Sequence, residues 1–405
     1  MAGPLDGIRV IEVASWMFVP SGGSVLVDWG ADVIKVEPMT GDPQRGLITS
    51  GLLPGGAGGV NFMVEQPHRG KRSIGLDLSH ADGREALLKL VETADVFLTN
   101  YLPPIRRKLK IDTDDIRARN PNIIIARGSG TGPKGPDAEK GGYDGASFWA
   151  RGGMGMTLPG LANGWPSGQP APAFGDVMGG LTTAGAIAAA LLKRERTGEP
   201  SIVDVSLLAT AMWQLSPLVV ASKLFGFSKI PQGDRTKNPN PGVGNYKTKD
   251  DRFISLILLQ SDKFWADLVT RLGLPDMVTD ERFADSAARA QNAEACIARL
   301  DEAFGSMTLA ELTDAFDGFA GVWATYQTLD ELYDDVQVVA NGYLPTMTTS
   351  NGEEVQLVAS PAQFDEVAVT VERAPEHGEH TELVLMDLGY DWDQIAAMKE
   401  SGAIL

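Results

Sequence analysis

Short apolar or extended runs alternate with helical patterns along the first half of the chain. Runs of strand length occupy residues 8–13, 33–36, 72–76, 96–98, 123–126 and 202–205. Between them, the spacing of apolar residues predicts helices over residues 24–29, 80–92 and 176–193. Strands that alternate with helices indicate parallel βαβ units. The sequence therefore predicts an α/β fold with a doubly wound parallel sheet.

Glycine and proline mark the predicted turns and one long loop region. Pro20-Ser21-Gly22-Gly23 predicts a turn, and Ser21 is placed to cap the helix that follows. Between residues 128 and 175 Gly and Pro dominate. A stretch of this kind inside a folded domain is usually a functional loop system.

A cluster of Pro, Asn and Gly over residues 232–244 predicts a hinge. The patterns beyond it predict a strand over residues 253–259 and helices over residues 263–272, 287–306 and 309–319. In the tail, Asn351-Gly352 predicts a hairpin turn, and a last helix is expected over residues 392–399. We therefore expect a small α+β domain at residues 229–334 and a large domain built from residues 1–228 and 335–405.

Composition narrows the class of protein. The 405 residues are 43% hydrophobic and 22% charged, which indicates a globular chain of two or three domains. The formal net charge of −18 argues against nucleic acid or an anionic membrane surface as the main partner. The N-terminus lacks the pattern of a signal peptide, and the small apolar stretch at residues 181–192 is too short to span a bilayer. With a single cysteine, Cys296, no intramolecular disulfide can form, and we expect a cytoplasmic enzyme.

Several common site motifs are absent from the sequence. The first predicted strand–helix turn lacks the G-x-G-x-x-G spacing of dinucleotide-binding proteins, and Glu37 is more simply a surface carboxylate than a ribose ligand. The four histidines form no metal-binding pattern, and there is no G-x-S-x-G elbow. We therefore expect no metal site, no bound NAD and no serine hydrolase.

Basic residues concentrate at Lys71-Arg72 and at Arg106-Arg107-Lys108, which follows Asn100-Tyr101. Loops that follow parallel strands gather at the carboxyl edge of the sheet, where ligands bind. A positive patch there suits a phosphorylated small ligand, and Tyr101 could stack against its base. A solvated run of charges is the simpler alternative, and these residues alone do not decide between the two.

Asp176 lies where the long apolar helix is predicted to begin. Backbone N–H groups and the helix dipole favour an ionised carboxylate at that place, so an N-cap aspartate is the simple interpretation. A nucleophilic carboxylate is the alternative, because Gly175, Gly179 and Gly180 would leave clearance for a substrate.

A series of short segments, in the same order, resembles one known family: the class III CoA-transferases, which include carnitine- and bile-acid-related members, formyl-CoA transferases and α-methylacyl-CoA racemases. The segments are Gly30-Ala31-Asp32-Val33-Ile34-Lys35-Val36-Glu37, Gly41-Asp42-Pro43 with Arg45, Gly70-Lys71-Arg72-Ser73-Ile74-Gly75-Leu76-Asp77-Leu78, Ala94-Asp95-Val96, Asn100-Tyr101, Gly130-Thr131-Gly132-Pro133, Gly142-Tyr143-Asp144, Gly175-Asp176, Arg196-Thr197-Gly198 and Gly378-Glu379-His380-Thr381. They span nearly the whole chain.

The resemblance implies a Rossmann-like large domain with an inserted small domain, and an interlocked homodimer. It places the catalytic aspartate at Asp176. The positions that it implies for CoA binding are Trp16, Arg72, Asn100, Tyr101, Lys108, Tyr143 and Asp144. At Lys108 the family commonly has arginine, and lysine keeps the charge but loses the two-pronged hydrogen bonding of a guanidinium group.

The resemblance also implies covalent transfer of CoA from an acyl-CoA donor to a carboxylic acid acceptor. Asp176 would carry first an acyl anhydride and then a CoA thioester, with CoA thioesters as substrates and no permanently bound cofactor. A lid that contains Gly242 and Gly244 would donate backbone N–H groups to the developing oxyanion.

Two alternatives accompany this hypothesis. A racemase of 2-methylacyl-CoA needs a histidine where this chain has Tyr143, and a glutamate that is missing near residues 260–264. A non-catalytic acyl-CoA-binding protein is the other alternative. Trp16, Met17 and Phe18 in the first loop, with Trp149 and Trp165, suggest a bulky or hydrophobic acyl group.

Overall fold

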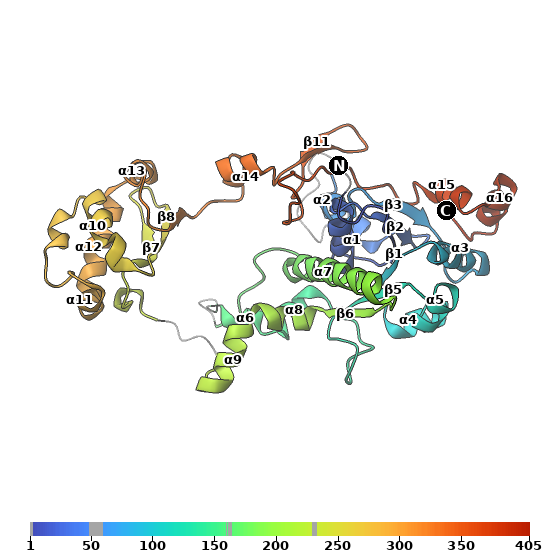
Figure 1. Ribbon diagram of the computed structural model, residues 1–405, viewed down its shortest axis with the longest axis horizontal. Coiled ribbons are helices and arrows are strands. Elements are labelled where there is room, and N and C mark those ends of the chain that lie inside the picture. The colour runs from blue at the N-terminus through green and yellow to red at the C-terminus, as the bar shows by residue number, and fades with distance from the viewer. Residues whose placement is uncertain (1–2, 48–59, 159, 161–163, 229–232) are drawn as a thin grey trace. The chain divides into compact units, whose positions relative to one another are not determined.

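Six parallel strands form the central sheet of the computed structural model, which describes residues 3–47, 60–158, 160, 164–228 and 233–405 (Figure 1). The strands are β1 (Arg9–Val13), β2 (Asp32–Glu37), β3 (Arg72–Gly75), β4 (Val96–Thr99), β5 (Ile124–Ser129) and β6 (Ile202–Ser206). Their order is β3-β2-β1-β4-β5-β6, so the chain reverses direction across the sheet between β1 and β4. In a doubly wound sheet, ligands bind outside the carboxyl ends of the strands at such a reversal. The predicted α/β fold is confirmed.

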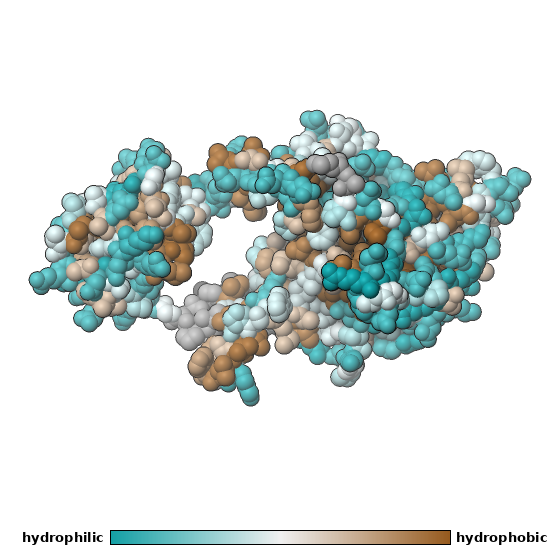
Figure 2. Space-filling view, in the orientation of Figure 1, coloured by the Kyte–Doolittle hydropathy of each residue, from teal (hydrophilic) through white to brown (hydrophobic). Residues whose placement is uncertain are grey.

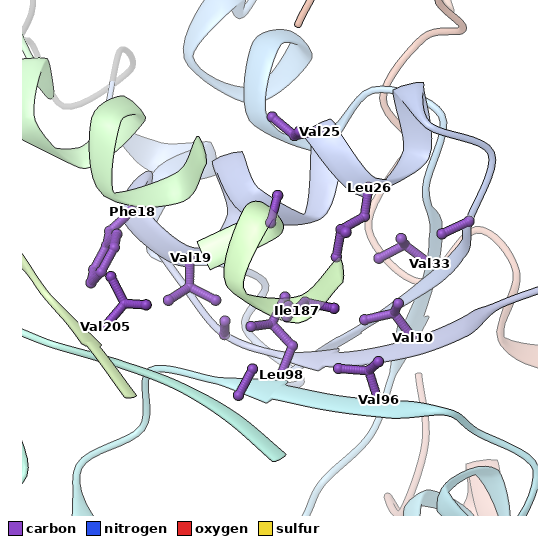
Figure 3. Packing of buried hydrophobic residues seen from close by; sticks show 14 of the residues in the cluster. Val10, Phe18, Val19, Val25, Leu26, Val33, Val96, Leu98, Ile187 and Val205 are labelled. Atoms are coloured by element: carbon purple, nitrogen blue, oxygen red, sulfur yellow. The ribbon is translucent and has the colours of Figure 1, made fainter. Parts of the chain in front are cut away.

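Helices cover both faces of this sheet, because successive side chains along each strand point to opposite faces. Val10 and Val33 pack against α1 (Phe18–Asp28) and α7 (Phe174–Thr197), as Figure 3 shows. Ile11 and Ile34 lie in the core on the opposite face. The helices that contribute to that core are α3 (Ala81–Glu92), α5 (Thr113–Arg119), α15 (Thr381–Asp387) and α16 (Trp392–Glu400).

The helix after β1 begins six residues earlier than predicted. Its N-cap is Met17, and Ser21 is not a cap but lies inside the helix, where its hydroxyl donates to the Met17 carbonyl at 2.6 Å. Pro20 is tolerated because the first turn of a helix needs no intrahelical N–H donor. A Cβ atom at Gly22 would lie 2.9 Å from the Gly180 carbonyl oxygen, so this glycine permits close packing of α1 on α7 and does not form a turn.

Helix α7 runs for 24 residues, and by length and composition it could cross a membrane. The expectation that this apolar segment is too short was therefore wrong. Its apolar character has another cause, because Ala184 and Ile187 are fully buried in the core beneath the sheet. Among the described residues, α8 (Leu207–Gln214) and α9 (Ser216–Phe225) pass the same test only as a pair, across a 70° bend.

The chain divides into two compact units, Met1–Ile230 with Val336–Leu405, and Pro231–Asp335. Residues 229–232 lie outside the described residues. The domain boundary expected after residue 228 adjoins them, and the expected hinge begins at residue 232, the last of them. The second unit has an antiparallel sheet and its own hydrophobic core, which includes Tyr246, Leu256 and Trp265. Its elements are β7 (Val243–Lys247), β8 (Phe253–Ile257), β9 (Trp323–Thr325), α10 (Ser261–Arg271), α11 (Ser286–Gln291), α12 (Ala293–Ser306) and α13 (Leu309–Ala315).

The remaining α-helices and strands belong to the first unit. They are α2 (Phe62–His68), α4 (Pro103–Leu109), α6 (Met154–Thr157), α14 (Val336–Asn341), β10 (Thr346–Thr348) and β11 (Glu354–Gln356). The predicted hairpin is confirmed, since β10 and β11 pair antiparallel around Asn351-Gly352 and Gly352 has φ = +88°.

Candidate active site

A pocket of about 350 Å³ opens at the carboxyl ends of the central strands β1, β4 and β5. Of the predicted site residues it brings together Trp16, Asn100, Tyr101, Tyr143 and Asp176. Its described lining is completed by Ser15, Phe18, Pro43, Leu102, Ile105, Gly128, Ser129, Gly130, Gly141, Gly142 and Leu207. Residues that lie up to 160 positions apart in the sequence thus meet where the chain reverses direction across the sheet.

Asp176 is the third residue of α7 and not its N-cap, which is Ala173. Burial raises the pKa of the Asp176 carboxyl to about 7, and the nearby Asp144 carboxyl acts in the same direction. Asp144 is itself buried at the start of a π-helix, Asp144–Ala150, and burial also raises its pKa. Its Oδ1 accepts a hydrogen bond from the Gly175 N–H at 3.1 Å, which ties the two acidic segments together.

The glycines around Asp176 do not provide clearance for a substrate, as the sequence had suggested. A Cβ atom at Gly175 would lie 2.2 Å from the Phe148 ring, and one at Gly179 would lie 2.4 Å from the Phe18 ring. The space beside each glycine is therefore filled by protein. The glycines bring aromatic rings and Asp144 close to the start of α7, and this crowding desolvates Asp176.

Trp16, in the loop between β1 and α1, also lines the pocket. Asn100 holds this loop from β4: the Ser15 N–H donates to Asn100 Oδ1 at 3.1 Å, and Asn100 Nδ2 donates to the Ser15 carbonyl at 2.6 Å. The indole of Trp16 meets Tyr143 edge-on, with ring centroids 5.7 Å apart. Sequence reasoning missed Ser15 and Ser129 as lining residues, because a lone serine after a strand carries no distinctive signal.

Arg72 is not brought to this pocket, although the resemblance implied a CoA-binding role. It lies at the amino end of β3, and its guanidinium group binds both carboxylate oxygens of Asp32 at 3.0 and 2.6 Å. The amino and carboxyl ends of parallel strands lie at opposite edges of a sheet, so Arg72 stands at the wrong edge.

The other predicted residues lie outside the pocket lining. Lys108 is exposed on α4. Gly242 and Gly244 belong to the second unit, where the Gly242 N–H already donates to Asn240 Oδ1 at 3.1 Å; their role in a lid stays a prediction. Of the aromatic residues linked to a bulky acyl group, Trp149 is buried in the core with its Nε1 donating to the Ser167 carbonyl, and Met17 and Trp165 do not line the pocket.

Two further hollows meet the pocket at Tyr101. The larger, about 630 Å³, is lined by Arg106 and Arg107 of the predicted basic patch, but not by Lys108. Carboxylates neutralise both arginines, in the pairs Arg106–Asp112 at 2.9 Å and Arg107–Glu139 at 2.7 Å, and Arg127 in the same hollow pairs with Asp204 at 2.8 Å. The smaller, about 300 Å³, lies between the ends of β2 and β3. In the described part of the chain, no group of three His, Cys, Asp or Glu side chains could hold a metal ion.

Comparison with known proteins identifies the class to which this fold and pocket belong. The family model for CoA-transferase family III matches residues 5–381. The chain belongs to this family, which confirms the resemblance, and it is a class III CoA-transferase that uses acyl-CoA substrates.

Several characterised relatives align over almost the whole chain. The cinnamoyl-CoA:phenyllactate CoA-transferase of Clostridium sporogenes is 30% identical over 402 residues, which cover 99% of this chain and 97% of that protein. The (R)-2-hydroxy-4-methylpentanoate CoA-transferase of Clostridioides difficile is 31% identical and covers 99% of each. The succinate–glutarate CoA-transferase of Agrobacterium fabrum is 31% identical, over 95% of this chain and 96% of its own. A crystal structure of Rv3272 from Mycobacterium tuberculosis superposes with a TM-score of 0.79 at 28% identity, covering 95% of this chain and 99% of that one.

The first prediction concerns the origin of the raised pKa of Asp176. Asp144→Asn should lower this pKa, because it removes the neighbouring negative charge while the amide oxygen can still accept from Gly175. The measurement is a pH titration of the ¹³C carboxyl signal of Asp176, assigned by its loss in Asp176→Asn. Asp204→Asn, which removes a carboxylate outside the pocket, should leave the midpoint unchanged. The same midpoint in wild type and Asp144→Asn would refute a contribution from Asp144.

Proposed function

We propose that this CoA-transferase moves CoA through covalent intermediates on Asp176. A carboxylate oxygen of Asp176 attacks the thioester carbonyl carbon of the donor, the C–S bond breaks, and CoA leaves as a thiolate, so that an acyl-aspartyl anhydride forms. The thiolate attacks the aspartyl carbonyl, which releases the donor acid and leaves an aspartyl-CoA thioester. The acceptor carboxylate then displaces the thiolate to form a second anhydride. Attack of the thiolate on the acceptor carbonyl gives the new acyl-CoA and returns Asp176 as a carboxylate.

The observation that carries this proposal is a partly buried carboxyl group that lines the pocket and whose pKa burial raises. An anhydride retains the free energy of the thioester only if water is excluded. Burial raises the pKa of Asp176 to about 7, so near neutral pH a large fraction is ionised and that carboxylate is more basic than a solvated one. The described lining of the pocket contains no histidine, which disfavours two-base racemisation.

We assign the CoA chain to the junction at Tyr101. This residue lines the pocket that contains Asp176 and also both neighbouring hollows. Lys108 stands on α4 between Arg107, which lines the larger hollow, and Leu109, which lines the smaller one. An exposed ammonium group there supports the proposed contact with a CoA phosphate.

The acyl group that we propose is bulky and hydrophobic. Trp16, Phe18 and Leu207 give the pocket an apolar wall. A second carboxylate on the substrate would need a basic partner, and the described lining of this pocket has neither lysine nor arginine. The names of the phenyllactate and hydroxymethylpentanoate enzymes support the same class, whereas the succinate–glutarate relative represents the competing one.

Replacing the proposed nucleophile tests the reaction directly. Asp176→Asn should lower CoA transfer by at least about a thousandfold, because the amide cannot form the anhydride. Incubation of the wild type with acyl-CoA and hydroxylamine should convert Asp176 to a hydroxamate, which peptide mass spectrometry would locate. Asp393→Asn, which changes an exposed carboxylate on α16, is the control, with transfer and trapping expected to match the wild type.

The alternatives give different results in this assay. Exchange of the C2 proton of a 2-methylacyl-CoA without a hydroxamate would indicate a racemase. Saturable binding of acyl-CoA without exchange or hydroxamate would indicate a binding protein. Transfer at the native rate by Asp176→Asn would exclude Asp176 as the nucleophile.

A panel of donors tests the proposed acyl class. Aryl and branched acyl-CoA donors should show a kcat/KM roughly tenfold or more above that of succinyl-CoA, since a buried second carboxylate would stay unpaired. The measurement is the initial rate of transfer to one common acceptor under identical conditions. A preference for succinyl-CoA would place this chain in the dicarboxylate class.

We also propose that the chain acts as a homodimer, which the family resemblance describes as interlocked. Figure 2 shows apolar side chains gathered over α9. Trp213 at the end of α8 is 80% exposed, and Leu224 and Phe225 on α9 are 70% and 77% exposed. An apolar surface of this kind indicates a contact with another chain. Sedimentation equilibrium should give twice the chain mass of 43.2 kDa, and a monomer throughout the concentration range would contradict the proposal.

A further inference from the structure

The backbone of Trp16 adopts a conformation that a bulky residue reaches only when its surroundings hold it. Its φ is +70°, in the left-handed region that favours glycine. Trp16 nevertheless carries the largest side chain of the pocket and lies directly before Met17, the N-cap of α1. The contacts that hold this residue therefore determine the shape of the pocket wall.

Side chains from three segments fix the backbone around Trp16. Asn100 binds the neighbouring Ser15 in both directions, as described above. Lys35 Nζ donates to the Ala14 carbonyl at 2.8 Å. The Trp16 N–H itself donates to Asp42 Oδ1 at 3.1 Å. Asp42 is thus the side chain that holds the strained residue directly.

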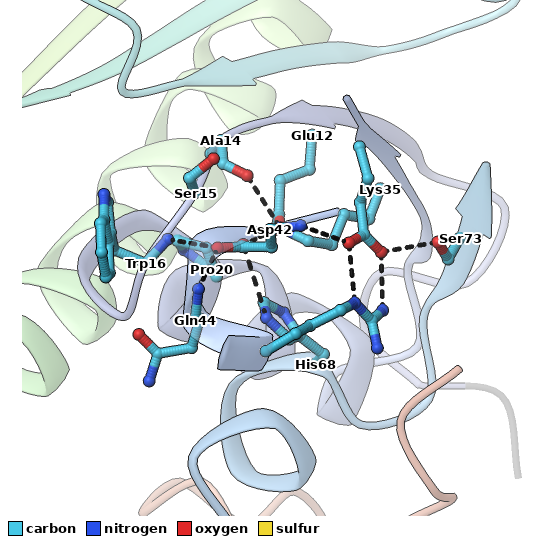
Figure 4. Close-up of polar contacts among 12 residues, drawn as sticks. Glu12, Ala14, Ser15, Trp16, Pro20, Lys35, Asp42, Gln44, His68 and Ser73 are labelled. Carbon is cyan, nitrogen blue, oxygen red and sulfur yellow. Dashed lines mark hydrogen bonds and ion pairs between the residues drawn. The ribbon is translucent and has the colours of Figure 1, made fainter. Parts of the chain in front are cut away.

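Asp42 connects this loop to a buried cluster of charges, shown in Figure 4. Its Oδ2 lies 2.8 Å from Lys35 Nζ, and Oδ1 also accepts from the Gln44 N–H at 2.9 Å. Its backbone N–H donates to Glu37 Oε2 at 2.9 Å. Glu37 is only 1% exposed, so the expectation that it is a surface carboxylate was wrong. With 2% exposure, Asp42 is nearly inaccessible to solvent.

The formal charges of the cluster balance. Its acidic members are Glu12, Glu37 and Asp42, and its basic members are Lys35, Lys71 and Arg45. His68 stands 3.7 Å from Asp42, but burial and the nearby cations hold its pKa well below the ordinary value, so it adds no charge. Removal of the Asp42 charge would leave one positive charge uncompensated in the interior.

We propose that Asp42 is a positioning residue for acyl selectivity: it holds Trp16 so that the indole stands against Tyr143 as the apolar wall facing the acyl group. The inference rests on the proposed acyl class. One oxygen of the Asp42 carboxylate accepts the hydrogen bond from the Trp16 N–H, and the other forms an ion pair with Lys35 on β2. The wall is therefore tied to the sheet, as accurate placement of a binding group requires.

A double-mutant cycle tests whether Asp42 acts through Trp16. The readout is the ratio of kcat/KM for 3-phenylpropionyl-CoA to that for acetyl-CoA as donors. Asp42→Glu keeps the charge but displaces the carboxylate by one methylene group, and should lower the ratio about tenfold. Trp16→Gly should lower it at least as much, since glycine accepts the left-handed conformation but provides no wall. In the Trp16→Gly background, Asp42→Glu should no longer change the ratio.

Glu12→Gln is the matched control. It removes one negative charge from the same cluster and loses contacts to Lys35 and Lys71, but Glu12 has no contact with the loop at residues 14–16. It should lower the thermal midpoint and leave the ratio unchanged. Asp42→Asn, compared with it, should lower both the midpoint and the ratio.

The proposal is overturned if Asp42→Glu leaves the ratio unchanged, if it acts equally with and without Trp16, or if Glu12→Gln changes the ratio as much as Asp42→Asn. These outcomes are separate from a failure of the proposed function. That failure would appear in the wild type as absent transfer, or as a preference for small or dicarboxylic acyl groups before any substitution at Asp42.

Discussion

The close approach of α1 and α7 is the constraint on which the site depends. A Cβ atom at Gly180 would lie 2.6 Å from Ser21 Cβ, and one at Gly179 would overlap the Phe18 ring. Both helices begin at the carboxyl edge of the sheet, α1 two residues after Trp16 and α7 two residues before Asp176. The glycines that let the helices touch therefore also place the aromatic wall and the acidic side chain in one pocket. A side chain at position 179 or 180 would meet α1 and push the two helices apart.

This packing also sets the electrostatics of the pocket. The first turn of a helix favours a negative charge, which by itself would lower the pKa of Asp176. The opposite shift is found because burial outweighs that effect and Asp144 adds a like charge nearby. A carboxyl group that titrates near pH 7 can exist in either form in the cell. Its ionised form is poorly solvated, which is the property that the proposed attack on a thioester carbonyl would use.

The sequence predicted the sheet well because the signal for a buried parallel strand is local. Runs such as residues 123–126 are apolar throughout and need no knowledge of their neighbours. The start of α1 was missed because Pro20 and Gly22 are turn formers whose use here depends on a helix 160 residues away. Asp176 was singled out mainly by resemblance, since an acidic residue at a helix start is common. Arg72 was assigned to the CoA site by resemblance, although its place at the start of a predicted parallel strand already indicated the amino edge of the sheet, away from the pocket.

The buried cluster around Asp42 is better explained by positioning than by stability. The attraction within a buried ion pair often does not repay the cost of removing both charges from water. That cost is visible at Lys71, whose pKa burial lowers to about 8 although it contacts Glu12 at 2.7 Å. Apolar residues could fill the same volume, but they could not accept the N–H of a residue in the left-handed conformation. The backbone geometry at Trp16 requires a hydrogen-bond acceptor that is fixed in the interior. Because the acceptor is the negatively charged Asp42 carboxylate, it requires the Lys35 ammonium group beside it.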